Sequence, residues 1–318
     1  TQIVIEAVAE RMDVKHKVFA QLAAQAPAEC ILATNTSSLS VSEIARAVPH
    51  PERVVGMHFF NPVKKMPLVE VVKGEHTSDA TVTAVAALAV RLGKTPVIVQ
   101  DVAGFLVNRL LGPYLDEAVR LFADGADPAR IDRLMLDFGM PMGPLRLLDE
   151  VGLDIASHAS AALHAAYGAR MTPCAAVQAL STPERLGVKT GRGFYVRTPR
   201  GKGKPSLAPD LARFQTGSAA RGLSDQDLRD RMLLSMANEA ARCLEQGVVS
   251  SAQVLDLATV FGMGFAPFHG GLMRWIEAEG RAEIAARLQR IAVAPDVVAR
   301  PGGAEKFTPA AWFRRDAR

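Results

Sequence analysis

The 318-residue sequence predicts an α/β domain followed by an all-α region. Three observations lead to this fold class. Short apolar runs alternate with segments of helical periodicity up to about Gln100, which is the pattern of an α/β domain. From Gly104 onward, strand signals almost disappear and long amphipathic segments take over. One of those helical segments recurs later in the chain, which divides the all-α region into two parts.

The α/β domain is expected to span residues 1–100. Its helices are expected at residues 11–24 and 80–92, where apolar side chains recur at helical spacing. Its strands share a short apolar composition and are bounded by polar or turn-forming residues. They are expected at residues 3–8, 31–34, 54–60, 68–72 and 96–99.

The all-α region is expected to form two helical domains, at residues 101–197 and 205–318. Residues 105–123 and 127–138 have the amphipathic spacing of helices. A Gly/Pro/Lys-rich stretch at residues 198–205 marks the boundary between the two domains.

An internal repeat relates these two helical domains. The segment NRLLGPYLDEAVRLFADG at residues 108–125 aligns without gaps with DRMLLSMANEAARCLEQG at residues 230–247. Further on, FGMPMGP at residues 138–144 aligns with FGMGFAP at residues 261–267. A duplicated helical unit of this kind usually serves packing or assembly.

The repeat places Asp230 where the first copy has Asn108. An ionised carboxylate cannot donate the hydrogen bond that an amide donates. We therefore expect any chemistry in the first helical domain and a structural role for the second, with His269 in a turn or an interface. Asn108 follows an apolar flank, so it is either a buried amide that needs partners or a surface residue.

The composition limits the possible classes of function. The chain is 49% hydrophobic and 22% charged, which is ordinary for a globular protein, and its net charge of +4 is scattered. A nucleic-acid surface would need a basic stripe with interleaved aromatics. The nearest candidate, RGKGK at residues 200–204, is interpreted as a solvated loop. No apolar run approaches the roughly 20 residues of a membrane span.

The three cysteines form no CxxC pair, so no zinc or redox motif is present. Cys30 and Cys243 lie in apolar runs and are expected to be buried thiols. This cysteine usage indicates a reducing compartment, and together with the lack of a signal peptide it favours the cytoplasm. The chain begins at Thr1 inside an apolar run, which we interpret as the start of a fragment.

His58 and Glu70 are the first candidates for chemistry. His58 stands in GMHFFNP near the expected end of a strand, where α/β sheets place their sites. Glu70 lies in the apolar run LVEVV, and a carboxylate there must be paired, because burying a bare charge is costly. Such a pair is suited to a general base, in which the carboxylate fixes the imidazole tautomer. The alternative is a structural histidine, the commoner role at such a position.

Further polar candidates follow the first two strands. Ser37 and Ser38 in NTSSL either cap the helix expected near Val41 or touch a substrate or cofactor. Glu10 and Lys15 either reach a ribose or phosphate group or are solvated charges at the start of a helix.

No phosphate-binding loop is visible in the sequence. G-x-G-x-x-G does not occur, and the glycine pairs of residues 139–143, 191–193 and 262–264 do not follow a strand. The residues alone therefore indicate an α/β plus helical enzyme and leave its chemistry open.

Six segments carry a combined signature: VIEAVAERMDVK, ATNTSSLSV, RVVGMHFFNPVKKMPLVEVV, DVAGFLVNRLLGPYLDEAVRL, GMPMGPLRLLDEVGLD and KTGRGFY. Together they resemble the 3-hydroxyacyl-CoA dehydrogenase family over residues 1–195. The match is most like the dehydrogenase part of the multifunctional fatty-acid oxidation complex α-subunit, in which a hydratase/isomerase domain comes first. Residues 225–279 resemble the extra C-terminal repeat of those subunits.

The resemblance implies a fold and a set of roles. The fold is a partial Rossmann-like NAD-binding domain with a parallel sheet, followed by two repeated dehydrogenase C-terminal domains. His58 is implied as the general base, and Glu70 as its partner. Asn108 and Ser37 are implied to bind the substrate oxygen. The residues implied to face NAD are Glu10, Lys15 and Asn35.

The resemblance also implies a place in fatty-acid β-oxidation, with an acyl-CoA substrate. The expected partners are a second copy of the chain or a thiolase in a multienzyme complex. In the family, the Gly-rich loop and the acidic ribose-binding residue would lie before Thr1, so we expect this chain alone to bind NAD poorly. The alternatives are a non-catalytic assembly module and a dehydrogenase of free hydroxy acids, which would use a lysine base.

Overall fold

The computed structural model describes residues 2–197 and 205–314. The chain divides into two compact units. The α/β unit comprises Thr1–Asn108 and Cys243–Gly264, and the helical unit comprises Arg109–Arg242 and Phe265–Arg318. The segment at residues 200–204, which the sequence predicts to be a solvated loop, lies outside the described residues. Most of the Gly/Pro/Lys-rich boundary at residues 198–205 does so as well.

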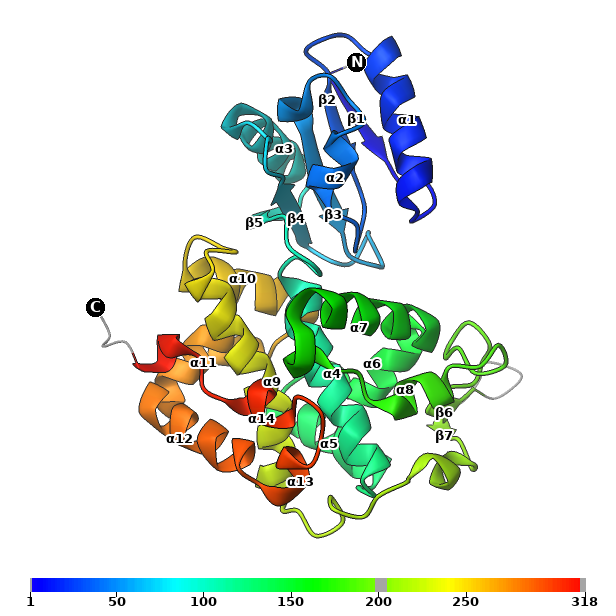
Figure 1. Cartoon of the computed structure of the whole chain (residues 1–318), viewed down its shortest axis with the longest axis vertical. Helices are drawn as coiled ribbons and strands as arrows, with labels where there is room; N and C mark the ends of the chain where they lie inside the picture. Colours follow the sequence, from blue (N-terminus) through cyan, green and yellow to red (C-terminus); the bar gives the residue numbers. More distant parts are fainter. Residues whose placement is uncertain (1, 198–204, 315–318) are drawn as a thin grey trace. The chain divides into compact units, whose positions relative to one another are not determined.

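The α/β unit is built on a five-stranded sheet in the order β1-β2-β3-β4-β5 (Figure 1). All five expected strands are present. They are β1 (Ile3–Glu6), β2 (Ile31–Thr34), β3 (Val54–Phe59), β4 (Leu68–Lys73) and β5 (Thr95–Gln100).

The expectation of an all-parallel sheet is wrong at one strand pair. β1, β2 and β3 are parallel to one another, as are β4 and β5, but β3 and β4 are antiparallel. Residues 60–67 are the whole connection between β3 and β4, and a parallel pair would need a crossover of a dozen or more residues. The antiparallel pairing sets His58 directly opposite Glu70.

Helices cover the sheet, and the hydrophobic core of the α/β unit lies between helix and strands. Apolar residues of β2, β3 and β4 pack with Val82, Val85 and Ala89 of one helix, and all are buried. Each fully buried valine-sized side chain contributes roughly 1.5–3 kcal/mol. A helix from the second repeat also packs on β4 and β5. The helical elements of this unit are α1 (Met12–Gln25), α2 (Val41–Ala45), η1 (Pro51–Arg53), α3 (Asp79–Arg91) and α10 (Ala252–Met263).

The helical unit confirms the expected change in secondary structure. Its long helices are α4 (Val107–Ala123), whose first two residues belong to the α/β unit, α5 (Pro128–Phe138) and α9 (Asp225–Glu245), which ends in the α/β unit. The remaining elements are α6 (Pro144–Val151), α7 (Leu153–Tyr167), η2 (Gly168–Met171), α8 (Ala175–Leu180), β6 (Tyr195–Val196), β7 (Ser206–Leu207), η3 (Leu211–Phe214), η4 (Pro267–His269), α11 (Leu272–Glu279), α12 (Arg281–Ala292), α13 (Pro295–Val298), α14 (Gly303–Phe307) and η5 (Ala311–Arg314).

The residues singled out in the second repeat have packing roles. Asp230 is 7% exposed and pairs with Arg287, whose Nε lies 2.8 Å from Asp230 Oδ2. His269 lies in the turn η4 and stacks on Phe138, with ring centroids 4.7 Å apart. Asp230 is thus committed to an internal ion pair, in line with the expected structural role.

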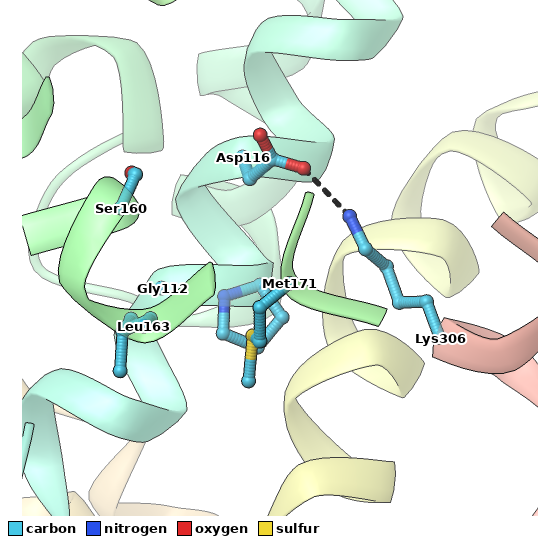
Figure 2. A pocket seen from close by; sticks show the side chains of 7 residues that line it. Gly112, Asp116, Ser160, Leu163, Met171 and Lys306 are labelled. Atoms are coloured by element: carbon cyan, nitrogen blue, oxygen red, sulfur yellow. Dashed lines mark hydrogen bonds and ion pairs between the residues drawn. The ribbon is translucent and has the colours of Figure 1, made fainter. Parts of the chain in front are cut away.

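A small cavity beside α4 is lined by a buried ion pair. Lys306 Nζ donates to Asp116 Oδ2 at 2.6 Å (Figure 2). The cavity measures about 10 Å³ and is also lined by Gly112, Ser160 and Leu163. A space of this size holds about one water molecule, so it is not a substrate site.

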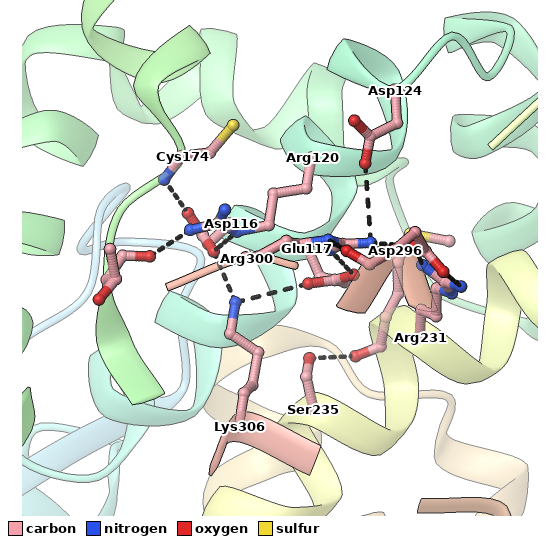
Figure 3. Close-up of polar contacts among 12 residues, drawn as sticks. Asp116, Glu117, Arg120, Asp124, Cys174, Arg231, Ser235, Asp296, Arg300 and Lys306 are labelled. Carbon is pink, nitrogen blue, oxygen red and sulfur yellow. Dashed lines mark hydrogen bonds and ion pairs between the residues drawn. The ribbon is translucent and has the colours of Figure 1, made fainter. Parts of the chain in front are cut away.

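A network of buried charges joins the C-terminal segment to α4 and α9 (Figure 3). Asp296 accepts hydrogen bonds from Arg231 at 2.9 Å and from Arg300 at 2.7 Å, and Arg300 also donates to Glu117 at 2.9 Å. Burial raises the pKa of the Asp296 carboxyl, but the hydrogen bonds and charges of Arg231 and Arg300 outweigh burial and lower it to about 2.

Replacing Asp296 with asparagine is expected to lower the free energy of unfolding at neutral pH by about 3 kcal/mol, because two nearly buried guanidinium groups lose their shared carboxylate. The pKa of Asp296 falls from 3.8 in its ordinary state to about 2 in the folded chain. Its contribution is therefore complete above about pH 4 and is lost as the pH falls towards about 2. Urea unfolding at several pH values measures this difference.

The matched control for that experiment is Asp137→Asn, since Asp137 is an exposed carboxylate of α5. The control should stay within about 0.5 kcal/mol of the parent chain. A constant difference between parent and Asp296→Asn from neutral pH down to about pH 2 would contradict the assigned electrostatic cause.

The cysteines agree with expectation. Cys30 and Cys243 are 1% and 0% exposed, and neither they nor Cys174 form a disulfide bond within the described residues. No helix in the ranges 2–197 and 205–314 is both long enough and apolar enough to cross a membrane.

Candidate active site

His58 and Glu70 form a buried pair across neighbouring strands. His58 Nδ1 lies 2.8 Å from Glu70 Oε2, and the side chains are 6% and 0% exposed. An ionised carboxylate only accepts hydrogen bonds, so Nδ1 must carry the proton of a neutral imidazole. The Nε2 atom then has the free lone pair, which is the state that a general base needs.

The second oxygen of Glu70 is held by the start of α4. The backbone amides of Leu106 and Val107 both donate to Glu70 Oε1 at 3.0 Å. The first amides of a helix have no partner within it, and they favour a negative charge. These two bonds fix the carboxylate, so its orientation towards His58 does not depend on His58 alone.

The loop after β2 folds around Glu10. Glu10 Oε1 accepts hydrogen bonds from the Thr36 hydroxyl at 2.7 Å, from the Ser37 amide at 2.9 Å and from the Ser38 amide at 3.1 Å. The alternative that Ser37 or Ser38 caps the next helix is wrong. The cap of α2 is Ser40, whose Oγ accepts from the amide of its third helical residue.

Glu10 and Lys15 differ in their surroundings. Lys15 is 1% exposed, and its Nζ lies 2.8 Å from Glu6 Oε1 and 3.4 Å from Glu10 Oε2. The alternative of a solvated charge is therefore wrong for Lys15. The Glu10 side chain is 37% exposed. Burial raises the pKa of Glu10, but hydrogen bonds from Thr36 and Ser37 and the charge of Lys15 outweigh burial and lower it.

Asn108 links this loop to α4, and Asn35 links it to the strand of the histidine. Asn108 is half-buried, and its Nδ2 donates to the Ser37 carbonyl oxygen at 3.3 Å. Asn35 Oδ1 accepts from the Phe59 amide at 2.9 Å, one residue after His58.

The seven candidate residues thus occupy two neighbouring groups in the α/β unit. One group is the buried dyad of His58 and Glu70. The other is the polar loop at the carboxyl ends of β1 and β2. Asn35 connects this loop to the strand of His58, and Asn108 connects it to α4. The sequence placed these residues up to 98 positions apart, and the parallel strands gather their carboxyl ends at one edge of the sheet.

Two further residues of this region, Glu6 and Asp101, are not among the candidates predicted from the sequence. Glu6 is 4% exposed and binds Lys15 and the Thr34 hydroxyl, the latter at 2.7 Å. It stands in IVIEAV, an apolar run like that of Glu70, so the same argument would have found it. Asp101 accepts from the Ser40 hydroxyl at 2.7 Å and from the Ser42 amide at 2.8 Å. No local pattern distinguishes Asp101 from an ordinary loop carboxylate.

Comparison with protein families gives two matches. The NAD-binding domain of 3-hydroxyacyl-CoA dehydrogenase matches residues 1–102, and the C-terminal domain of the same enzyme family matches residues 104–197.

Solved structures similar to this chain include three dehydrogenases. A 3-hydroxybutyryl-CoA dehydrogenase from Escherichia coli is 28% identical, with 98% of this chain and 80% of that chain covered and a TM-score of 0.81. An (S)-3-hydroxybutyryl-CoA dehydrogenase from Ralstonia eutropha is 41% identical, with 62% and 71% covered and a TM-score of 0.60. The dehydrogenase part of multifunctional enzyme 1 from C. elegans is 30% identical, with 98% and 71% covered and a TM-score of 0.68.

Proposed function

The chain belongs to the 3-hydroxyacyl-CoA dehydrogenase family of NAD-dependent oxidoreductases, and on that premise we propose that His58 is the general base in the oxidation of the 3-hydroxyl group of an acyl-CoA to a ketone. The observation that carries the proposal is the buried pair of His58 and Glu70. Its 2.8 Å contact at Nδ1 leaves Nε2 as the atom that accepts a proton.

The proposed step balances in protons and electrons. His58 Nε2 takes the proton of the 3-hydroxyl group as the O–H bond breaks and the C=O bond forms. The electron pair of the C3–H bond leaves with its hydrogen as hydride, for which NAD supplies the acceptor. Glu70 stabilises the imidazolium that results. Asn108 and Ser37 hydrogen-bond the substrate oxygen and orient the C3–H bond.

The residues present fit one half of the cofactor. Glu10, Lys15 and Asn35 lie around the carboxyl ends of β1 and β2, where α/β sheets bind nucleotides, and we assign them to the nicotinamide half. Of these, Lys15 acts through Glu10, because its own ammonium is buried.

The residues of this sequence do not supply the usual binding element for the pyrophosphate half. The sequence has no Gly-rich loop after a strand, and the outer edge of β1 pairs with no other strand among the described residues. Ile5 of β1 and Val8, which follows β1, are each 42% exposed. We propose that a strand–loop–helix segment pairs with β1 and binds the pyrophosphate through its backbone amides.

We place the reaction in fatty-acid β-oxidation within a multifunctional cytoplasmic protein. The repeat of α4 in α9 and the buried pair of Asp230 and Arg287 support a second, structural copy of the helical domain. The three cysteines, which form no disulfide within the described residues, support a reducing compartment. A homo-oligomer or a complex with a thiolase completes this proposal.

The open edge of β1 also favours a second candidate, a non-catalytic assembly module, because an unpaired strand edge is a ready site for another chain. On this alternative, the His58–Glu70 pair only stabilises the sheet. The two candidate functions differ in one measurable property, because only the dehydrogenase converts substrate.

NADH consumption with acetoacetyl-CoA tests the proposal, with this chain run beside a version extended at its N-terminus by a strand, a Gly-rich loop and a helix. The extended chain is expected to turn over and to bind NADH about 10–100-fold more tightly, because charged hydrogen bonds to the pyrophosphate contribute about 1.5–3 kcal/mol. Turnover by neither folded chain would reject the catalytic role of His58 and favour the assembly module.

A further inference from the structure

The turn that leads into α4 has an unusual backbone. Gly104 has a φ of 73°, and Phe105 follows with a φ of 48°. Among the residues that the structure describes, Phe105 is the one with positive φ that is not glycine. L side chains disfavour this left-handed conformation, and for a bulky residue it marks strain.

The strained residue lies at the dyad. The Phe105 side chain is 1% exposed, and its ring centroid is 5.7 Å from that of His58, with an angle of 57° between the planes. Phe60 lies against the same imidazole, with a centroid distance of 4.5 Å. Two aromatic rings therefore contact the imidazole, and these contacts restrict its rotation.

The backbone of the same turn serves the other member of the dyad. The residues directly after Phe105 are Leu106 and Val107, whose amides donate to Glu70 Oε1 at 3.0 Å. The left-handed turn at residues 104–105 comes directly before these two amides in the chain. Phe105 thus contacts His58 with its ring, and its backbone leads directly into the two amides that bind the Glu70 carboxylate.

Glycine would adopt a φ of 48° without strain, so the side chain of Phe105 must contribute something that glycine lacks. Core filling alone does not require the left-handed conformation, since a buried phenylalanine packs equally well in an ordinary helix or strand. The two contacts of the turn, ring to His58 and amides to Glu70, both act on the same proton-transfer pair.

We propose that Phe105 is a positioning residue for the His58–Glu70 dyad. Its ring fixes the plane of the imidazole, and its left-handed backbone aims the α4 amides at Glu70. This inference rests on the proposed function in one respect, that His58 is the base.

The first test needs no turnover. In a chain carrying isotopically labelled histidine, nuclear magnetic resonance follows the proton on His58 Nδ1, which His58→Gln identifies among the seven histidines. Phe105→Ala is expected to raise the solvent exchange rate of this proton about tenfold or more, because the imidazole gains freedom to leave Glu70. Phe105→Leu keeps apolar bulk and should give an intermediate rate.

Phe19→Leu is the matched control, since Phe19 is a fully buried phenylalanine of α1 in the same unit. It should lower stability while leaving the His58 signal unchanged. An unchanged exchange rate in both Phe105 variants would overturn the inference. A signal lost equally in Phe19→Leu would also overturn it, because the effect would then follow from general loosening of the unit.

The second test is kinetic and uses the form of the protein that turns over acetoacetyl-CoA. Phe105→Ala is expected to lower kcat about 10²-fold, the size of effect that a small misplacement of catalytic groups produces, while both KM values change less than about threefold. Phe105→Leu should recover part of kcat. A rise in KM with unchanged kcat would contradict a positioning role.

The two tests separate this inference from the proposed function. If His58→Gln retains full turnover, the general-base assignment fails, and the exchange measurement still decides whether Phe105 holds the imidazole. If His58→Gln loses turnover and Phe105→Ala behaves like the parent chain, only the positioning role fails.

Discussion

Replacing His58 with glutamine is expected to lower kcat for acetoacetyl-CoA reduction by about 10²–10⁴-fold, the contribution typical of a general acid–base residue. Glutamine has similar length, and its amide can still donate to Glu70 Oε2, now 2.8 Å from His58 Nδ1. The carboxylate therefore keeps a partner, and the fold is spared the cost of a bare buried charge. Glutamine cannot gain or lose a proton at neutral pH, so the proton relay is removed. Steady-state kinetics of the active form measures the loss.

The matched control is His50→Gln, because His50 is 58% exposed and pairs with Glu52 at the surface. Its kcat should equal that of the parent chain. Size-exclusion chromatography of both variants should give the parent's assembly state. If His58→Gln kept kcat, the dyad would be structural; if it changed the assembly state instead, the assembly module would be the better account of the chain.

Replacing Glu70 with glutamine is expected to have an effect of similar size, about 10²–10⁴-fold on kcat, through the tautomer of His58. The amides of Leu106 and Val107 need an acceptor, so the glutamine oxygen takes the place of Glu70 Oε1. The glutamine NH₂ group then faces His58 Nδ1, which must accept. The imidazole proton moves to Nε2, and that atom can no longer take a proton from the substrate.

Steady-state kinetics with acetoacetyl-CoA checks this prediction, beside Glu75→Gln as the matched control. Glu75 is an exposed glutamate that follows β4, and its replacement should leave kcat unchanged. Thermal unfolding of Glu70→Gln should remain cooperative, since the hydrogen bonds to the amides survive. Full activity of a well-folded Glu70→Gln would show that the carboxylate does not set the tautomer.

Local sequence patterns predicted most of the secondary structure. The strand expected at residues 31–34 is β2 (Ile31–Thr34), and the helix expected at residues 127–138 is α5, which is one residue shorter. Such elements follow from periodicity, because burial of one face or of a whole strand is a local demand on the sequence. The same demand identified Glu70, since an acidic residue within an apolar run needs a partner wherever that run is buried.

Long-range pairing explains what local patterns missed. Lys15 reads as a charge at the start of a helix, and only the fold shows that Glu6 binds it in the interior. The repeat predicted a second helical domain, but α10 packs on the sheet of the α/β unit. These outcomes depend on which surfaces meet, and the spacing of residues along one segment contains no information about the surface that covers it.

The sequence by itself determined the alternation of strands and helices, the change to long helices after residue 100, and the residue types available for proton transfer. Only the tertiary structure decided that β4 runs antiparallel to β3, which sets Glu70 opposite His58, and that the turn at Phe105 brings two helix amides to the same carboxylate. The physical reason is the range of the interactions. Helical and strand periodicity reflects burial within a few residues, whereas a buried proton-transfer pair needs partners 12 and 36 residues apart, whose meeting depends on the path of the whole sheet.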